Sequence, residues 1–150
     1  MPRDWKKNPE LRNSEFEIYY FESPHKQITE DFRANVVKVT DGDTIRVKTN
    51  FRDFDFPIRF LGTNAPEMNE PRGKEVRDWL SNLILNADVD ILIDRNNRVG
   101  KWGRLLGKII HGGQEVGQMM IGLGKSTTFS SRKEGQLPSM DKELNIEKWL

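Results

Sequence analysis

The sequence predicts a mainly β domain of the α+β class, in which a small barrel carries packed helices. A chain of 150 residues has room for one hydrophobic core and is too short for two. Runs rich in β-branched residues recur between residues 34 and 111. One amphipathic helical pattern interrupts these runs and a second one follows them. We therefore expect a closed sheet with helices against it.

The first two predicted strands form a hairpin. The runs 34–40 (ANVVKVT) and 44–49 (TIRVKT) flank the tripeptide 41–43 (DGD). An Asp-Gly pair between two β-rich runs is a hairpin signal because these residues suit the tight turn. A third strand is expected at 57–62 (PIRFLG), after a turn region at 51–56 (FRDFDF).

The clearest helix is expected at residues 73–86. Its apolar side chains recur at the spacing that places them on one helical face. These residues are Val76, Trp79, Leu80, Leu83 and Ile84.

Two more strands and a second helix follow. Strands are expected at 88–94 (DVDILID) and 103–111 (GRLLGKIIH), and a helix at 114–123. The apolar face of this second helix is formed by Val116, Met119, Met120 and Leu123. A short helix is expected at 139–150. This order of elements is typical of a five-stranded Greek-key barrel of the OB type with two or three packed helices.

The chain divides into an N-terminal arm at 1–33, a barrel domain at 34–130 and a tail at 131–150. The arm has scattered charges and prolines but no sustained apolar period. Only 15–21 (EFEIYYF) has the composition of a short strand, which would need a partner edge in this sheet or in another chain. We expect the barrel to fold without the arm, which is then available to bind a protein partner or a second copy of the chain.

The composition excludes several classes of protein. The net charge of +1 and the 35% of hydrophobic residues fit neither a membrane protein nor a uniformly basic nucleic-acid coat. The chain has no cysteine and two histidines, so any metal must be held by oxygen atoms. It shows no apolar stretch of about 18 residues and no signal-peptide core, which favours a protein that is intracellular or packaged in an assembly.

One stretch carries a local positive charge. Between residues 95 and 114 there are five basic residues and no Asp or Glu. They are Arg95, Arg98, Lys101, Arg104 and Lys108. Such a run either attracts phosphate or forms a solvated charged face, and taken alone it favours the second reading.

Three short blocks carry the candidate chemistry: 41–44 (DGDT), 59–67 (RFLGTNAPE) and 101–104 (KWGR). Each alone is explained as a turn, a loop or the start of a strand. Together they supply carboxylates and arginines. Phosphodiester hydrolysis needs a cation on a phosphate oxygen, an oriented water and fixed positive charge, and these side chains can supply each part.

In these blocks the chain resembles the staphylococcal nuclease (thermonuclease) family, over about residues 34–129. The resemblance implies that Asp43 binds Ca²⁺, with Mg²⁺ as the alternative, together with Asn64 and the backbone carbonyl of Ala65. Asp41 would lie behind these ligands, near the metal. The family usually has Asp where this chain has Asn64, so the metal site loses one negative charge and lower affinity is expected.

The resemblance also implies the catalytic and substrate-binding roles. Glu67 would activate or position the attacking water, while Arg59 and Arg104 grip the phosphate. The expected substrate contacts are Lys101, Trp102 and Thr128. Members of the family cut DNA and RNA with little sequence preference. Trp102 stands where a tyrosine is usual, and it is read either as a stacking platform or as a ring that covers the edge of the barrel.

Three functions are carried forward. The first is a divalent-metal-dependent nuclease, a phosphodiesterase acting on DNA, RNA or both, with the choice between endonuclease and exonuclease action left open. The second is a catalytically weak or inactive barrel that serves as a binding or structural module in a larger assembly, such as a virus particle. The third is plain nucleic-acid binding by the barrel surface, which the acidic pair Asp41 and Asp43 disfavours in the absence of a metal.

Overall fold

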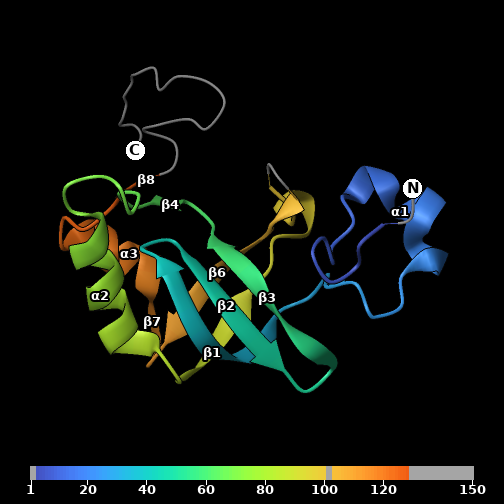
Figure 1. The fold of residues 1–150 in the computed structure, drawn as a ribbon, viewed down its shortest axis with the longest axis horizontal. Helices are drawn as coiled ribbons and strands as arrows, with labels where there is room; N and C mark the ends of the chain where they lie inside the picture. The colour runs from blue at the N-terminus through green and yellow to red at the C-terminus, as the bar shows by residue number, and fades with distance from the viewer. Residues whose placement is uncertain (1–2, 101–102, 129–150) are drawn as a thin grey trace.

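The computed structural model describes residues 3–100 and 103–128. A β-barrel lies at the centre, with helices α2 and α3 on one side and the N-terminal arm on the other (Figure 1). Within the described residues, no helix is long and apolar enough to cross a membrane.

Five strands close the barrel, as predicted. They are β1 (Phe32–Asp41), β2 (Thr44–Thr49), β3 (Arg52–Phe60), β5 (Asp88–Leu92) and β6 (Leu105–His111). The first three form an antiparallel meander, and β5 lies between β1 and β6. A parallel pairing of β3 with β6 closes the sheet on itself. Three further strands of two residues each are β4 (Thr63–Asn64), β7 (Gln114–Glu115) and β8 (Thr127–Thr128).

Helix α2 (Gly73–Ile84) covers one end of the core with the predicted apolar face. Its side chains Val76, Leu80 and Ile84 have no exposed surface, and they join the buried residues of the barrel. Helix α3 (Val116–Gly122) buries Val116 and Met120. The expectation that Leu123 belongs to the apolar face of this helix is wrong, because the helix ends at Gly122 and the Leu123 side chain is 57% exposed.

The expected turn region at 51–56 is strand instead. Strand β3 begins at Arg52, which pairs with Thr49, and Phe56 pairs with Val47 in the barrel wall. The physical reason is a period-two alternation within FRDFDF, in which Asp53 and Asp55 face solvent while Phe56 is buried. The turn itself is only two residues long.

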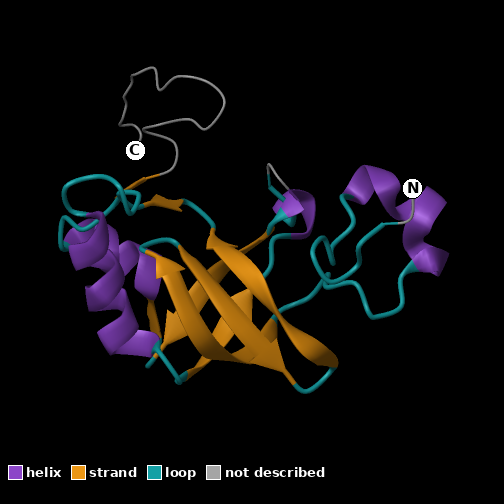
Figure 2. Cartoon of the chain, viewed as in Figure 1, coloured by secondary structure: helices purple, strands orange, loops and turns teal. Residues whose placement is uncertain are grey.

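The expected strand at 15–21 is also wrong. The arm forms η1 (Asn13–Glu15), α1 (Phe16–Tyr19) and η2 (Tyr20–Glu22), drawn as short helical segments beside the barrel in Figure 2. No sheet edge among the described residues pairs with this segment, so its backbone bonds locally. Its apolar residues remain exposed: Ile18, Tyr19, Tyr20 and Phe21. The helix expected at 139–150 lies outside the described residues.

The arm is nevertheless docked on the barrel. Leu11 and Ile28 are buried with 0% and 3% of their surface exposed, and the polar Glu10 and Gln27 are buried beside them. The Gln27 side chain bonds the arm to itself, accepting from the Leu11 amide at 2.6 Å and donating to the Pro9 carbonyl at 2.7 Å. An ordered arm with its own buried side chains is therefore part of the folded molecule.

Candidate active site

Gly42 brings the first turn of the barrel against the loop that follows β4. A Cβ atom at this position would lie 2.6 Å from the Ala65 Cβ atom and 2.7 Å from a methyl group of Val76. Real Cβ atoms do not approach this closely, so only glycine allows the contact. The turn at 41–43 therefore packs on both the Ala65 loop and helix α2, and this packing places Asp43 beside Ala65.

Asp43 is only 7% exposed, and hydrogen bonds hold both its carboxylate and its backbone. Its Oδ2 atom accepts from the Ala65 amide at 2.8 Å, and its Oδ1 atom accepts from the Thr44 hydroxyl at 3.2 Å. The amide of Asp43 donates to Asp41 Oδ1 at 3.1 Å. The Asp41 carboxylate thus stabilises the turn through the Asp43 amide, and the Asp43 carboxylate has one fixed orientation.

Arg59 joins this carboxylate from the neighbouring strand, where its backbone pairs with Thr44. Its Nη2 atom lies 3.4 Å from Asp43 Oδ2 and donates to Asn64 Oδ1 at 3.1 Å. Its Nη1 atom donates to the carbonyls of Thr63 and Phe60, at 2.7 and 3.0 Å. With 7% of its surface exposed, Arg59 is a rigid positive charge that links Asp43 to Asn64.

The pKa of Asp43 is raised from 3.8 to about 6. Burial is the largest cause, because it disfavours the charged carboxylate, and the nearby Asp41 raises the pKa further. Arg59 and the Ala65 amide act in the opposite direction without fully compensating. The site therefore contains a desolvated negative charge that a further cation would stabilise.

Asn64 and Thr128 belong to two short strands that pair with each other. Strands β4 and β8 pair Asn64 with Thr127 and Thr63 with Thr128, and the Thr127 hydroxyl donates to the Asn64 carbonyl at 3.3 Å. Thr128 is exposed. Strand β8, remote from Asn64 in the sequence, thus borders the same site.

Glu67 lies in the exposed loop between β4 and α2. Its amide donates to the Glu70 carboxylate, and its carbonyl packs so tightly on Gly73 that a Cβ atom there would lie 1.9 Å away. Within residues 3–100 and 103–128, the Glu67 carboxylate has no hydrogen-bond or ion-pair partner. The backbone of this loop is fixed while the carboxylate is open to water.

Arg104 lies one residue before β6, whose parallel pairing with β3 places Leu106 beside Arg59. Arg104 therefore lies two residues before the position on β6 that faces Arg59. The Arg104 side chain is half-buried, and its Nε atom is buried with no hydrogen-bond partner among the described residues. Lys101 and Trp102 lie outside the described residues.

The sequence of the whole chain was compared with known families and proteins. The staphylococcal nuclease homologue family matches residues 57–148, more than half of the chain. The chain belongs to this family. A protein named uncharacterized endonuclease from Escherichia coli O157:H7 is 28% identical over 120 residues, which is 79% of this chain and 75% of the relative. A micrococcal nuclease from Shigella flexneri is 33% identical over 79 residues, or 53% of this chain and 42% of that protein.

Few acidic side chains gather around Asp43 in this member of the staphylococcal nuclease homologue family. In the part of the chain that the structure describes, no three His, Cys, Asp or Glu side chains form a metal-binding group. A metal here would have to combine the Asp43 carboxylate with the Asn64 amide oxygen and a main-chain carbonyl. Such an oxygen set fits a hard cation such as Ca²⁺ or Mg²⁺, and the desolvated charge on Asp43 supports that fit.

Sequence reasoning missed the residues that orient the site. The Thr44 hydroxyl acts on the adjacent Asp43, whereas the close contact at Gly42 and the hydroxyl of Thr127 act between segments that are distant in the sequence. Arg98 was read as part of a local positive run, yet it is 2% exposed and bound by the arm. Of these, Gly42 and Thr44 had a sequence signal, because both stand in the DGDT block.

Proposed function

We propose that this chain is a divalent-metal-dependent nuclease that hydrolyses phosphodiester bonds of DNA, RNA or both with little sequence preference. The observation that carries the proposal is the rigid cluster of Asp43, Arg59 and Asn64, joined by contacts of 3.1 and 3.4 Å. A carboxylate for a cation and an arginine for a phosphate are there held in one place before any substrate arrives. Pre-organised charge of this kind is the largest single contribution in many hydrolytic sites.

Each side chain has a role in this proposal. Asp43, Asn64 and the carbonyl of Ala65 would hold Ca²⁺ or Mg²⁺, with Asp41 fixing the turn behind them. A bound divalent ion would polarise a phosphate oxygen. Arg59 and Arg104 would bind the phosphate and the charge that develops on it.

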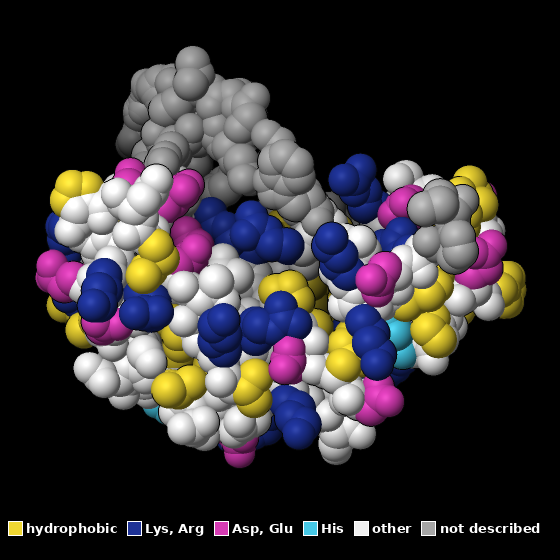
Figure 3. Space-filling model, viewed as in Figure 1, with side chains coloured by type: hydrophobic (Ala, Val, Ile, Leu, Met, Phe, Trp, Pro, Cys, Tyr) yellow, Lys and Arg dark blue, Asp and Glu magenta, His cyan; other side chains and the backbone are white. Residues whose placement is uncertain are grey.

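Glu67 would accept a proton from the attacking water, since its carboxylate is exposed and unpaired within the described residues. Lys101, Trp102 and Thr128 would contact the nucleic acid beyond the scissile bond. On the face drawn in Figure 3, Lys and Arg side chains gather over the barrel between the helical side and the arm, which favours a polyanionic substrate. The names of the two relatives, an endonuclease and a micrococcal nuclease, support the same class of reaction.

A single gel tests the proposal. Wild type, Asp43→Ala and Glu67→Gln are incubated with single-stranded DNA and with RNA, in Ca²⁺, in Mg²⁺ and in EDTA. We expect cleavage by wild type with metal, and a loss of at least about 100-fold in either variant, because each removes an essential role. Full cleavage in EDTA would rule out the metal-dependent mechanism.

Asn64 favours a second candidate, an inactive barrel that acts as a binding module. Its amide oxygen accepts from Arg59 and carries no charge to hold a cation. The variant Asn64→Asp separates the candidates, because it adds a charged ligand at equal side-chain length. In a working enzyme, it should tighten Ca²⁺ binding measured by calorimetry and raise the rate at limiting Ca²⁺, with a smaller gain at saturation. An inactive module would bind Ca²⁺ more tightly and still cut nothing.

A further inference from the structure

A buried carboxylate of the arm binds two arginines of the barrel. Glu10 is 1% exposed, and its Oε2 and Oε1 atoms lie 2.6 Å from Arg52 Nη2 and 2.9 Å from Arg98 Nη2. Arg52 begins β3, while Arg98 follows the short helix η3 (Arg95–Asn97). Removing the carboxylate from such a buried set leaves uncompensated charge, so each arginine depends on Glu10.

Arg98 is bound almost entirely by the arm. Its Nε atom donates to the Ile28 carbonyl at 2.8 Å, and its Nη1 atom donates to the Leu11 carbonyl at 2.7 Å and to Asn13 Oδ1 at 3.1 Å. With the bond from Nη2 to Glu10, all three nitrogens of the guanidinium have arm acceptors. Burial lowers the pKa of Arg98, whereas Glu10 acts to raise it. The Arg98 side chain is thus fixed by hydrogen-bond acceptors that the arm supplies.

The backbone of Arg98 forms the base of the turn that carries Arg104. The Leu106 amide donates to the Arg98 carbonyl at 2.7 Å, and the Gly100 amide donates to the Arg104 carbonyl at 2.8 Å. We call this segment the Arg104 turn, described at residues 98–100 and 103–106. Whatever fixes Arg98 therefore fixes one end of the Arg104 turn.

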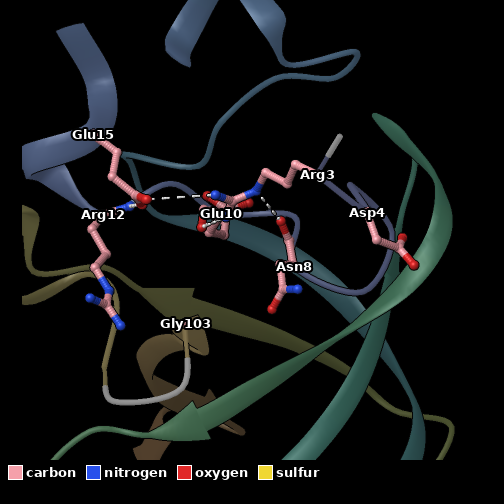
Figure 4. A pocket seen from close by; sticks show the side chains of 7 residues that line it. All are labelled: Arg3, Asp4, Asn8, Glu10, Arg12, Glu15 and Gly103. Atoms are coloured by element: carbon pink, nitrogen blue, oxygen red, sulfur yellow. Dashed lines mark hydrogen bonds and ion pairs between the residues drawn. The ribbon is translucent and has the colours of Figure 1, made fainter. Parts of the chain in front are cut away.

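The arm also borders this turn at Gly103. Arg3, Asn8, Arg12 and Gly103 are among the residues around a cavity of about 440 Å³ between the arm and the turn. In Figure 4, Asn8 and Arg12 point from the arm toward the loop that carries Gly103. A Cβ atom at Gly103 would lie 3.8 Å from Asn8 Oδ1. The turn is thus held at Arg98 and bordered by the arm at Gly103.

We infer that Arg98, seated in the arm by Glu10, is a positioning residue that sets the place of Arg104 for phosphate binding. The inference rests on the proposed function, in which Arg104 grips the phosphate. A functional side chain must be held to about 0.5 Å by the residues around it, and a misplacement of 1 Å can cost about 100-fold in rate.

Arg52 provides a matched control. It binds the same Glu10 carboxylate, is equally buried and donates to the Lys26 carbonyl at 2.7 Å, but it lies on β3 away from the Arg104 turn. Full-length Arg98→Lys and Arg52→Lys both lose the planar fork and should both lower the midpoint of urea unfolding. Only Arg98→Lys should loosen the turn.

The experiment measures the turn and the reaction separately, at a temperature where both variants are folded. Hydrogen exchange is followed at the amides of Leu106 and Gly100, with kcat and KM measured on single-stranded DNA. We expect Arg98→Lys to speed exchange at these amides and to lower kcat about tenfold with little change in KM. Arg52→Lys should leave both readouts unchanged. When Arg98→Lys is added to Arg104→Lys, it should cause little further loss of kcat, because Arg98 affects the rate only through the position of Arg104.

A milder variant keeps the inference testable if Arg98→Lys does not fold. Asn13 is exposed, accepts from Arg98 and donates to the Arg95 carbonyl at 2.9 Å, so Asn13→Ala removes two bonds to the same loop. We expect faster exchange at Leu106 and a loss of about threefold in kcat. Equal effects of the Arg98 and Arg52 variants, or additive losses with Arg104→Lys, would overturn the inference. If wild type cuts nothing, the proposed function fails, and the exchange data alone decide whether the arm holds the turn.

Discussion

Arg104 and Lys108 lie close together along the chain but differ in what their charge can do. Arg104 is half-buried beside the β3 strand that carries Arg59, whereas Lys108 is exposed on β6. We predict that Arg104→Lys lowers the cleavage rate about 10- to 100-fold although the charge is kept, because lysine lacks the planar fork that fits two phosphate oxygens. Initial rates at saturating metal give the measurement.

Lys108→Ala is the control for this prediction. It removes a charge but should change the cleavage rate less than about twofold, since an exposed lysine acts on the substrate only through the long-range electrostatic field of the protein. Arg59→Lys should lower the cleavage rate as Arg104→Lys does. It should also lower the stability of the fold, because the hydrogen bonds from the Arg59 guanidinium to the Thr63 and Phe60 carbonyls are lost. If the Arg104 and Lys108 variants behave alike, the arginine only attracts the substrate.

The carboxyl group of Asp43 makes stability depend on pH. Its pKa is about 6 in the folded protein, against an ordinary value of 3.8 for an exposed aspartate, so the folded state binds more protons between these values. The free energy of unfolding therefore falls as the pH rises from about 4 to 6, and this contribution is constant above that range. We predict that deprotonation of Asp43 lowers the free energy of unfolding of the metal-free protein by about 2 kcal/mol or more.

Asp43→Asn isolates this contribution, because the amide keeps an acceptor for Ala65 and cannot titrate. Urea unfolding of both proteins in EDTA at pH 4, 5, 6 and 7 gives the difference between them. Asp43→Asn should become the more stable of the two toward pH 7. A difference that is constant across the range would mean that the carboxylate is well compensated in the fold. Added Ca²⁺ should stabilise only wild type.

At the scale of elements, the site depends on close packing between the turn at 41–43 and helix α2. Gly42→Ala would place a Cβ atom within 2.7 Å of both Ala65 and Val76, so the turn must shift away from its neighbours. We predict a loss of about 1 to 3 kcal/mol in the free energy of unfolding. Ca²⁺ affinity should fall as well, because Asp43 moves with the turn.

Gly122→Ala is the matched control for Gly42→Ala. It adds the same methyl group at the end of α3, where nothing lies within 4 Å. This change should be neutral or slightly stabilising, because alanine is the better helix former. Urea unfolding measures both effects and calorimetry measures Ca²⁺ binding. Equal results for the two variants would show that the turn can absorb the extra atom.

At the scale of the whole molecule, the arm and the barrel stabilise one another. Leu11 and Ile28 are buried, and the Glu10 carboxylate forms ion pairs with both Arg52 and Arg98. The expectation that the arm is dispensable therefore gives way to a different prediction. A chain that begins at Asp31 should lose about 3 kcal/mol or more in its free energy of unfolding, since each lost apolar side chain contributes about 1.5 to 3 kcal/mol.

Glu10→Gln in the full chain tests the ionic part of the same contact. It leaves two buried arginines without their counter-charge, so a loss of about 3 kcal/mol is expected. Thermal and urea unfolding of both proteins provide the comparison. If the shortened chain unfolds at the midpoint of the full chain, the arm contributes nothing to the barrel.

Several features of this protein were determined by the sequence alone. The β1–β2 hairpin, helix α2 and the five-strand order follow from turn chemistry and periodicity, which act over a few residues. The DGDT and RFLGTNAPE blocks likewise indicated the region of the site. Short-range patterns of this kind can be read from a window because each residue is constrained by its near neighbours.

Other features were decided only by the tertiary structure. Glu10 binds Arg98 across 88 positions, and the pairing of β3 with β6 places Leu106, two residues after Arg104, opposite Arg59. No local pattern distinguishes these charged residues from solvated ones, and Arg98 in particular lies in a run that resembles an exposed basic face. Burial of such a charge becomes favourable only when distant segments supply every acceptor at once, a condition that exists in the folded chain alone.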